Sequence, residues 1–174
     1  MISKDTSAER EDVAAVKSVS PSKVADNLRR QCSKREYCVS DVQAKAIRML
    51  GGDRNRADEI VAALVEEKYV DDRRYAHSYV RDKSSLGGWG VTKIRYMLSL
   101  KGIPRDVIDE AILEIDSSKA ASKLERLMEC KCRSLLGDPQ CKLKLLRYGL
   151  GRGYSYEQLE PLVSRLIKET RGTI

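Results

Sequence analysis

The side chains of this sequence best suited to a functional surface are basic, and several of them lie close together along the chain. Lys93 and Arg95 flank the apolar Ile94 in one predicted helix. Lys144 and Arg147 are three residues apart, which places them on one helical face. Ammonium and guanidinium groups bind phosphates and acidic protein surfaces. The candidate binding residues are Lys93, Arg95, Lys101, Lys142, Lys144, Arg147 and Arg152.

Positive charge is concentrated in one part of the chain. The sequence of 174 residues has a formal net charge of +7. Between Lys119 and Arg152 there are nine bases and three acids, and nine minus three leaves +6 in this segment. Such a distribution is typical of a protein that binds a polyanion. A solvated, lysine-rich helix surface has the same composition, so the charge alone leaves both interpretations open.

The residues that most often catalyse reactions form no catalytic pattern. His77 is the only histidine, and a helix would place it beside Arg81 on a solvated surface. The carboxylate pairs that begin at Asp71 and Asp109 suit a helix cap and a solvent face. The run Gly87-Gly88-Trp89-Gly90 lacks the lysine and the preceding strand of a phosphate-binding loop. We therefore predict a protein that is not an enzyme and has no cofactor.

The five cysteines fit reduced thiols better than disulfides or a metal site. Their number is odd, and their spacing matches no disulfide framework. Cys130 and Cys132 would point about 200° apart around one helix, so they would not share a metal ion. The N-terminus has no apolar signal core, and no apolar run reaches the length of a membrane span. We expect a monomeric, cytoplasmic protein without a membrane partner.

Short helices with tight joints must hold the candidate basic residues. Asp71 or Asp72 can cap a helix that the glycines at 87–90 end. A second helix begins near Val91, and Gly102 closes it in the left-handed conformation. Pro104 then suits the first position of a third helix. The stretch from Asp71 onward therefore predicts a unit of three helices.

Comparable patterns lie on both sides of this central unit. Residues 1–22 lack a sustained apolar stripe, which predicts a flexible tail. A first helix over 22–37 is followed by a second that ends at Gly51-Gly52 and a third that starts near Asn55. A long helix over 117–136 opens the last third of the chain. The expected boundaries are 1–22 for the tail and 23–70, 71–116 and 117–174 for three units.

Two serines have the spacing of helix caps. Ser40 with Gln43 predicts a capping box for the second helix, and Ser155 with Gln158 predicts one for the last helix. Pro161 lies inside that last helix, where it should produce a kink.

The apolar stripes recur at a nearly constant spacing. The stripe of Ile60, Ala63 and Leu64 recurs at Ile108, Ala111 and Ile112, a shift of 108 minus 60, or 48. Arg152-Gly153-Tyr154 follows Lys101-Gly102-Ile103 at a shift of 51. Gly149 falls where Leu98 stands in the central unit, which predicts weaker packing in the third. Helical units with this period stack into an elongated array. The predicted fold is all-α, with three tandem three-helix repeats, and a compact globule of nine helices is the alternative.

The central unit resembles the signature of the RecX family, bacterial regulators of the RecA recombinase. The residues that carry the resemblance are Leu64, Tyr69-Val70-Asp71-Asp72, Arg74-Tyr75-Ala76, Gly90, Lys93-Ile94, Leu98, Lys101-Gly102-Ile103 and Ile108. Arg35-Glu36-Tyr37 and Arg152-Gly153-Tyr154-Ser155 resemble two further motifs, and the similarity covers roughly residues 24 to 168. The resemblance implies repeats that curve into an extended array, and binding along the groove of a recombinase filament on single-stranded DNA. It also implies that this binding suppresses ATP hydrolysis and strand exchange.

The expected partners follow from this resemblance. They are a RecA-type recombinase filament and single-stranded DNA, which the protein would contact directly or through the filament. The resemblance does not single out the seven candidate basic residues, which rest on charge and spacing. For Arg35 we expect an ion pair between neighbouring units. A helix-turn-helix-like protein that acts directly on duplex DNA, and a helical scaffold for acidic proteins, are the alternative functions.

Overall fold

Nine helices form three consecutive groups of three in the computed structural model, which describes residues 20–172. Unit 1 comprises α1 (Pro21–Cys32), α2 (Val39–Met49) and α3 (Arg54–Glu66). Unit 2 comprises α4 (Asp72–Ser85), α5 (Val91–Leu100) and α6 (Arg105–Leu113). Unit 3 comprises α7 (Ser117–Arg133), α8 (Cys141–Gly151) and α9 (Tyr156–Gly172). The predicted tail lies outside the described residues, except that α1 already includes residues 21 and 22.

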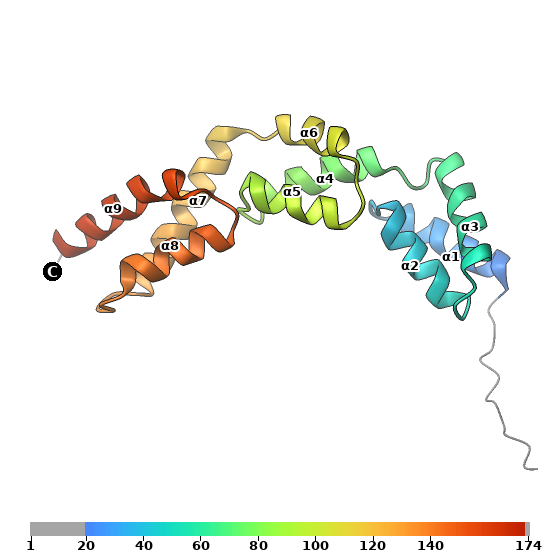
Figure 1. Ribbon diagram of the computed structural model, residues 1–174, viewed down its shortest axis with the longest axis horizontal. Coiled ribbons are helices and arrows are strands. Elements are labelled where there is room, and N and C mark those ends of the chain that lie inside the picture. Colours follow the sequence, from blue (N-terminus) through green and yellow to red (C-terminus); the bar gives the residue numbers. More distant parts are fainter. Residues whose placement is uncertain (1–19, 173–174) are drawn as a thin grey trace, which may run out of the picture.

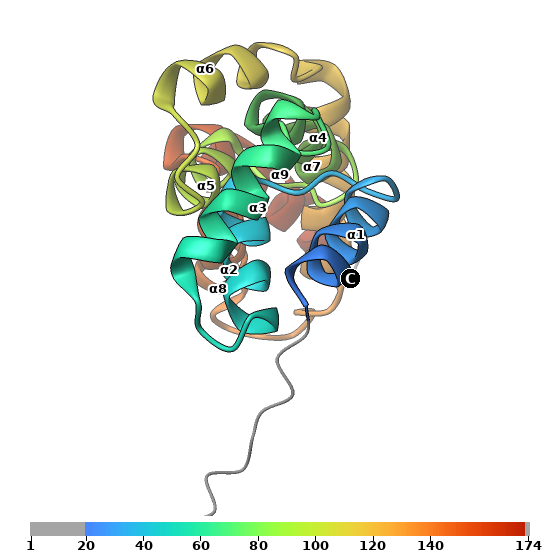
Figure 2. The same cartoon turned by 90° about the vertical axis from the view of Figure 1, so that its right-hand side faces the viewer.

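The three units follow one another along an arch (Figure 1). Unit 2 forms the crown, with α6 on the outer side, and the middle helices α2, α5 and α8 lie toward the inner side. Figure 2 looks along the arch and shows the units lined up behind one another. The residues that the structure describes contain no strand. The prediction of an all-α, elongated and curved array of three-helix repeats is confirmed, and a compact globule is excluded.

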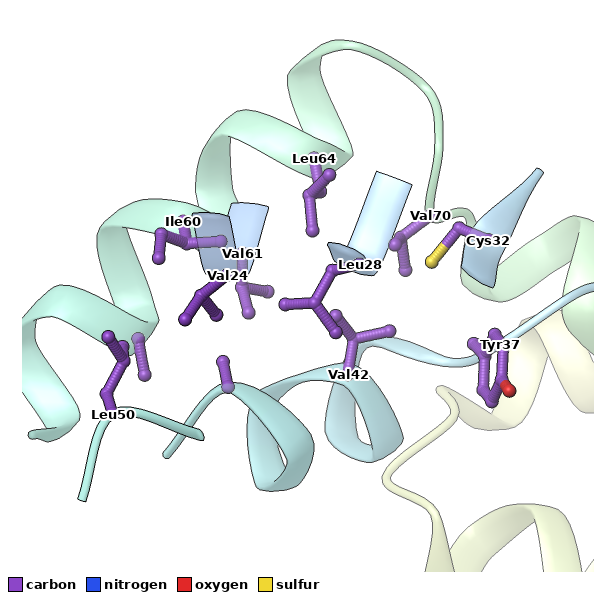
Figure 3. Packing of buried hydrophobic residues seen from close by; sticks show 12 residues of the cluster. Val24, Leu28, Cys32, Tyr37, Val42, Leu50, Ile60, Val61, Leu64 and Val70 are labelled. Carbon is purple, nitrogen blue, oxygen red and sulfur yellow. The ribbon is translucent and has the colours of Figure 1, made fainter. Parts of the chain in front are cut away.

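Each unit buries the apolar stripes of its three helices in a core of its own. In unit 1, Leu28 of α1, Val42 of α2 and Leu64 of α3 are almost completely buried (Figure 3). Tyr37 lies at the opposite end of this core from Leu50. Cys38 is the exception to the separation, because it belongs to the chain segment of unit 1 but packs into the core of unit 2. Burial of separate small stripes is what a repeat architecture requires.

The helix ends form largely where the sequence predicts them. Asp71 caps α4, because its side chain accepts a hydrogen bond of 3.0 Å from the Arg74 amide. Gly102 has a φ of 77°, in the left-handed region, and closes the turn after α5. The capping box of α9 is also present, with hydrogen bonds of 3.3 Å and 2.9 Å that Ser155 and Gln158 exchange. These ends depend on local hydrogen bonds, which nearby residues specify.

The predictions for the first two helices need correction. Helix α1 ends at Cys32 instead of continuing to Tyr37. Cys38, not Ser40, occupies the N-cap position of α2, and its own side chain makes no capping hydrogen bond. The amide of Val39, the first residue of α2, donates a hydrogen bond of 2.8 Å to Asp72 Oδ1 of unit 2. The Ser40 hydroxyl instead donates a hydrogen bond of 2.7 Å to the carbonyl of Lys101 in unit 2. A contact between units has therefore replaced the expected local capping box.

The burial pattern also corrects two details of the repeat. The buried stripe of α3 consists of Ile60, Val61 and Leu64, and that of α6 consists of Val107, Ile108 and Ala111. The shift between the two stripes is 107 minus 60, or 47 residues, instead of the predicted 48. Each helix has two adjacent apolar residues, which is why the sequence does not distinguish the two shifts. Gly149 is buried, and a β-carbon there would lie 2.4 Å from Leu159 Cδ2. The glycine therefore allows α8 to pack closely on α9, and the expected weakening is wrong.

Helix α9 continues through Pro161 to the end of the described residues. Over residues 20–172, none of the helices combines the length and the apolar character that crossing a membrane would require.

Candidate nucleic-acid interface

Two of the candidate basic residues, Lys93 and Arg152, lie at the joint between units 2 and 3. The Lys93 ammonium donates a hydrogen bond of 3.0 Å to the carbonyl of Gly151. In the opposite direction, from unit 3 to unit 2, Arg152 Nη1 donates a hydrogen bond of 2.7 Å to the carbonyl of Gly87. The Gly90 amide also donates to the carbonyl of Arg152, over 2.8 Å. Both cations therefore hold the turn after α8 against the turn before α5.

Lys101, another candidate from unit 2, lies at the joint between units 1 and 2. Its ammonium lies 2.9 Å and 2.7 Å from the two carboxylate oxygens of Asp41, at the start of α2. Burial by itself would raise the pKa of Asp41, but the hydrogen bonds from Lys101 and Cys38 and the positive charge of Lys101 together outweigh it and leave the pKa below its ordinary value. The turn after α5 thus docks on the start of α2 much as the turn after α8 docks on the start of α5.

Glu36 makes the ion pair between units that the sequence analysis assigned to Arg35. Arg74 Nε of α4 donates a hydrogen bond of 2.6 Å to Glu36 Oε1. The Arg35 guanidinium lies 4.3 Å above the ring centre of Tyr37, within its own unit. The expectation for Arg35 is therefore wrong by one residue, because the sequence does not show which neighbour faces α4.

The four other candidates are spread over units 2 and 3. Arg95 forms an ion pair with Asp109, Lys142 with Glu160, and Lys144 with Asp138. Arg147 is exposed and has no hydrogen bond or ion pair within the described part of the chain. The seven candidates therefore do not form one cluster, and a binding role for them remains a prediction.

A second set of bases forms a stripe on α7. The stripe consists of Lys123, Arg126 and Arg133, which we call the α7 basic stripe. The spacings of three and seven residues place these side chains along one side of the helix. Arg126 and Arg133 are exposed, Lys123 is half-buried, and none of the three has an ion pair within residues 20–172. The sequence analysis missed this stripe, although the helical spacing of the three bases would have revealed it.

Cations also lie over aromatic rings in all three units. In unit 1, Lys45 Nζ lies 4.0 Å from the ring centre of Tyr37. In unit 2, Lys93 Nζ is 4.4 Å from Trp89, whose ring lies 6.4 Å from that of Tyr79. In unit 3, Arg152 lies 4.7 Å from Tyr148. Aromatic rings interleaved with cations are typical of surfaces that bind single-stranded nucleic acids.

His77 is less exposed than the sequence predicts. Its Nδ1 atom lies 3.0 Å from Glu114 Oε1, and its Nε2 atom lies 3.8 Å from Glu110 Oε1. The side chain is only 21% exposed, so it links α4 to α6 instead of standing free in solvent. Its two glutamate neighbours give the residue a structural position.

Comparison with known proteins identifies the central unit most clearly. The model of the RecX second three-helix domain matches residues 71–112, which contain α4, α5 and all of α6 except its last residue. Regulatory protein RecX of Clostridium botulinum strain Eklund 17B is 33% identical over 125 residues, which are 70% of this chain and 58% of that protein. Regulatory protein RecX of Clostridium tetani is 29% identical over 121 residues, 67% of this chain and 55% of that protein. The chain thus spans a little over half the length of these relatives.

Two crystal structures of RecX proteins share the fold. A structure of regulatory protein RecX has a TM-score of 0.70 and 23% identity, and the match covers 82% of this chain and 70% of that one. The structure of RecX from Lactobacillus salivarius has a TM-score of 0.63 and 21% identity, covering 84% of this chain and 96% of that one. The matched central domain and the curated relatives show that the chain belongs to the RecX family of regulatory proteins.

Proposed function

We propose that the protein binds a recombinase filament on single-stranded DNA and inhibits the ATPase and strand-exchange activities of that filament. By doing so it modulates homologous recombination and DNA repair. Membership of the RecX family supports a regulatory role, because the matched relatives are named as regulatory proteins.

The observation that carries this proposal is the α7 basic stripe on an arch-shaped molecule. Arg126 and Arg133 are exposed and have no ion pair among the described residues, so their charges are available to a partner. The three units extend in a row along an arch, a shape that suits an elongated partner such as a polymer (Figure 1). A polymer of nucleic acid and protein presents repeated negative charge, and each contact with it weakens as salt rises.

The test is a titration of DNA-dependent ATP hydrolysis by the recombinase. We expect the protein to slow hydrolysis at amounts well below one molecule per recombinase subunit. The double variant Arg126→Glu and Arg133→Glu should need at least about tenfold more protein for the same inhibition, since two attractive contacts become repulsive. The matched control, Arg30→Glu and Arg54→Glu, changes the same charge at exposed arginines of unit 1 that have no ion pair among the described residues.

The two variants separate the proposal from its alternatives. Unchanged hydrolysis at a stoichiometric excess of wild-type protein would refute filament inhibition. Equal loss in both double variants would mean that net charge, and not the α7 basic stripe, determines binding. Tight binding to one duplex sequence without inhibition would favour the helix-turn-helix-like alternative.

A further inference from the structure

A pocket of about 380 Å³ lies at the joint between units 1 and 2. We call it the joint pocket. Unit 1 contributes Arg35 and Tyr37 from the segment between α1 and α2, and unit 2 contributes Tyr75, Tyr79 and Lys83 from α4. Because its walls belong to two units, the pocket exists only while these units are docked on each other.

The walls of the joint pocket are aromatic. Tyr37 and Tyr75 are each 9% exposed, so their rings are fixed by packing. The ring of Tyr79 lies 5.7 Å from that of Tyr75. Rings held in the wall of the pocket favour a flat aromatic ligand, which can stack or pack edge-on against them.

The charges that line the pocket nearly cancel. Glu36 is paired with Arg74 through Oε1, and Asp41 is paired with Lys101, while the buried Oε2 atom of Glu36 has no hydrogen-bond partner among the described residues. The remaining charged groups are the Asp82 carboxylate and the cations Arg35 and Lys83. Such an interior is poorly suited to a free phosphate or a metal ion, which need strong charge of one sign. It suits a neutral ring whose polar edge can donate a hydrogen bond to a carboxylate.

The two cations mark where the charged part of such a ligand would lie. Arg35 is exposed and lies 4.3 Å above Tyr37. The Lys83 ammonium lies 5.3 Å from the ring centre of Tyr79. Each cation is therefore held beside one of the tyrosine walls, where it can neutralise a phosphate attached to the bound ring.

From this combination we propose that the joint pocket binds an unstacked nucleobase. Tyr79 stacks on the base, the edge of Tyr37 borders it, Asp82 accepts a hydrogen bond from its edge, and Arg35 and Lys83 neutralise the neighbouring phosphates. The base belongs to a single nucleic-acid strand that runs across the joint, and a free nucleotide offers the same chemistry. This inference rests on the proposed function for its single-stranded ligand, but its test needs no recombinase.

The test measures the affinity of the full-length protein for two labelled strands at low salt. One is a short oligodeoxyadenylate, and the other is a strand of the same length that carries no bases. For the wild-type protein, we expect the strand with bases to bind about tenfold more tightly, in line with the usual effect of removing one stacked base. In the Tyr79→Leu variant this preference should disappear, while the affinity for the strand without bases stays unchanged. That unchanged affinity also shows that the variant is folded.

The matched control is Tyr96→Leu, which removes a ring that is 60% exposed on α5 and lies outside the joint pocket. This variant should keep the full preference for bases. Competition by deoxyadenosine monophosphate would identify a free nucleotide as a second source of the base. The proposal is overturned if the wild-type protein binds both strands equally, or if Tyr79→Leu weakens both by the same factor. Either result leaves inhibition of the recombinase untouched.

Discussion

Two glycines determine how closely units 2 and 3 approach each other. A β-carbon at Gly90 would lie 2.2 Å from the carbonyl oxygen of Gly153. A β-carbon at Gly153 would lie 2.4 Å from Lys93 Cβ, and its φ of 87° is itself unfavourable for other residues. The two backbones therefore touch directly, and the joint tolerates no side chain at either position.

Replacement of Gly90 by alanine should force the backbones at Gly90 and Gly153 apart. Gly90 has a φ of −76°, which alanine adopts freely, so the cost arises from the collision with the backbone of Gly153. We expect the variant to lose about 1–3 kcal/mol of unfolding free energy, the usual cost of overpacking. Urea denaturation followed by circular dichroism measures this loss.

Gly151→Ala provides the control for this substitution. No other group lies within 4 Å of a β-carbon at Gly151, and the residue ends helix α8. Alanine should therefore be neutral or slightly stabilising there, by up to about 1 kcal/mol. Equal destabilisation by the two substitutions would show that the close approach at Gly90 does not hold the joint.

The ion pair of Asp41 and Lys101 should make the other joint sensitive to pH. The folded protein lowers the pKa of Asp41 from 3.8, so the stabilisation is present above that value and is lost as the pH falls through the lower folded pKa. The pKa of Lys101 is raised from 10.5, despite burial, by its hydrogen bond to Asp41, so its contribution is complete below that value. The pair therefore stabilises the joint between these two limits.

Asp41→Asn should reduce the unfolding free energy by about 1 kcal/mol at neutral pH, since the pair is partly exposed. The difference from wild type should shrink as the pH falls below 3.8, the ordinary pKa of the carboxyl group. Denaturant titrations at a series of pH values measure this difference in unfolding free energy. Glu59→Gln, at an exposed residue without a partner among the described residues, should show no such dependence. A pH-independent effect of Asp41→Asn would contradict this role of the pair.

Among the elements, helix α9 illustrates which features the sequence alone could predict. Its capping box forms because Ser155 and Gln158 are three residues apart, and no other part of the chain is needed. The same reasoning failed for Ser40, whose hydroxyl bonds to a carbonyl 61 residues away. Most helices, their end signals and their apolar stripes depend on residues close in sequence, so the sequence predicts them. Contacts across the joints depend on how whole units dock, so the sequence does not show them.

Ser155→Ala should therefore weaken α9 specifically. The variant loses a side-chain acceptor for the Gln158 amide, and we expect a loss of about 1 kcal/mol in unfolding free energy. Thermal unfolding followed by circular dichroism provides the measurement. Ser22→Ala, at an exposed serine within α1, removes a hydroxyl without a cap and should have little effect. If the two variants were equally stable, the capping box would not contribute to α9.

The candidate site shows the same division between local and distant information. The charge of the segment from Lys119 to Arg152 was visible in the sequence, but the partners of its bases were not. Lys144 pairs with Asp138 in the folded chain, whereas Arg126 and Arg133 have no ion pair within the described residues. The sequence therefore shows where positive charge is concentrated, but not which of these bases the fold leaves without an ion pair. Which of them bind a partner stays a prediction.

At the scale of the whole molecule, the two joints are built differently. Backbone groups of units 2 and 3 meet directly at Gly90, Arg152 and Gly153. Units 1 and 2 meet mainly through side chains, in the pairs of Asp41 with Lys101 and of Glu36 with Arg74. The α7 basic stripe therefore has a fixed position relative to unit 2. The central claim is that this fixed arrangement lets the arch inhibit a recombinase filament.

The most direct test compares inhibition of recombinase ATPase activity by the wild-type protein, Gly90→Ala and Gly151→Ala. The measurement is made at a temperature where all three have the same helix content. Gly90→Ala keeps every charge and changes only the angle between units 2 and 3, so we expect it to inhibit at least about tenfold less effectively, while Gly151→Ala inhibits like wild type. Full inhibition by Gly90→Ala would contradict the claim that the rigid arch places the stripe on the filament.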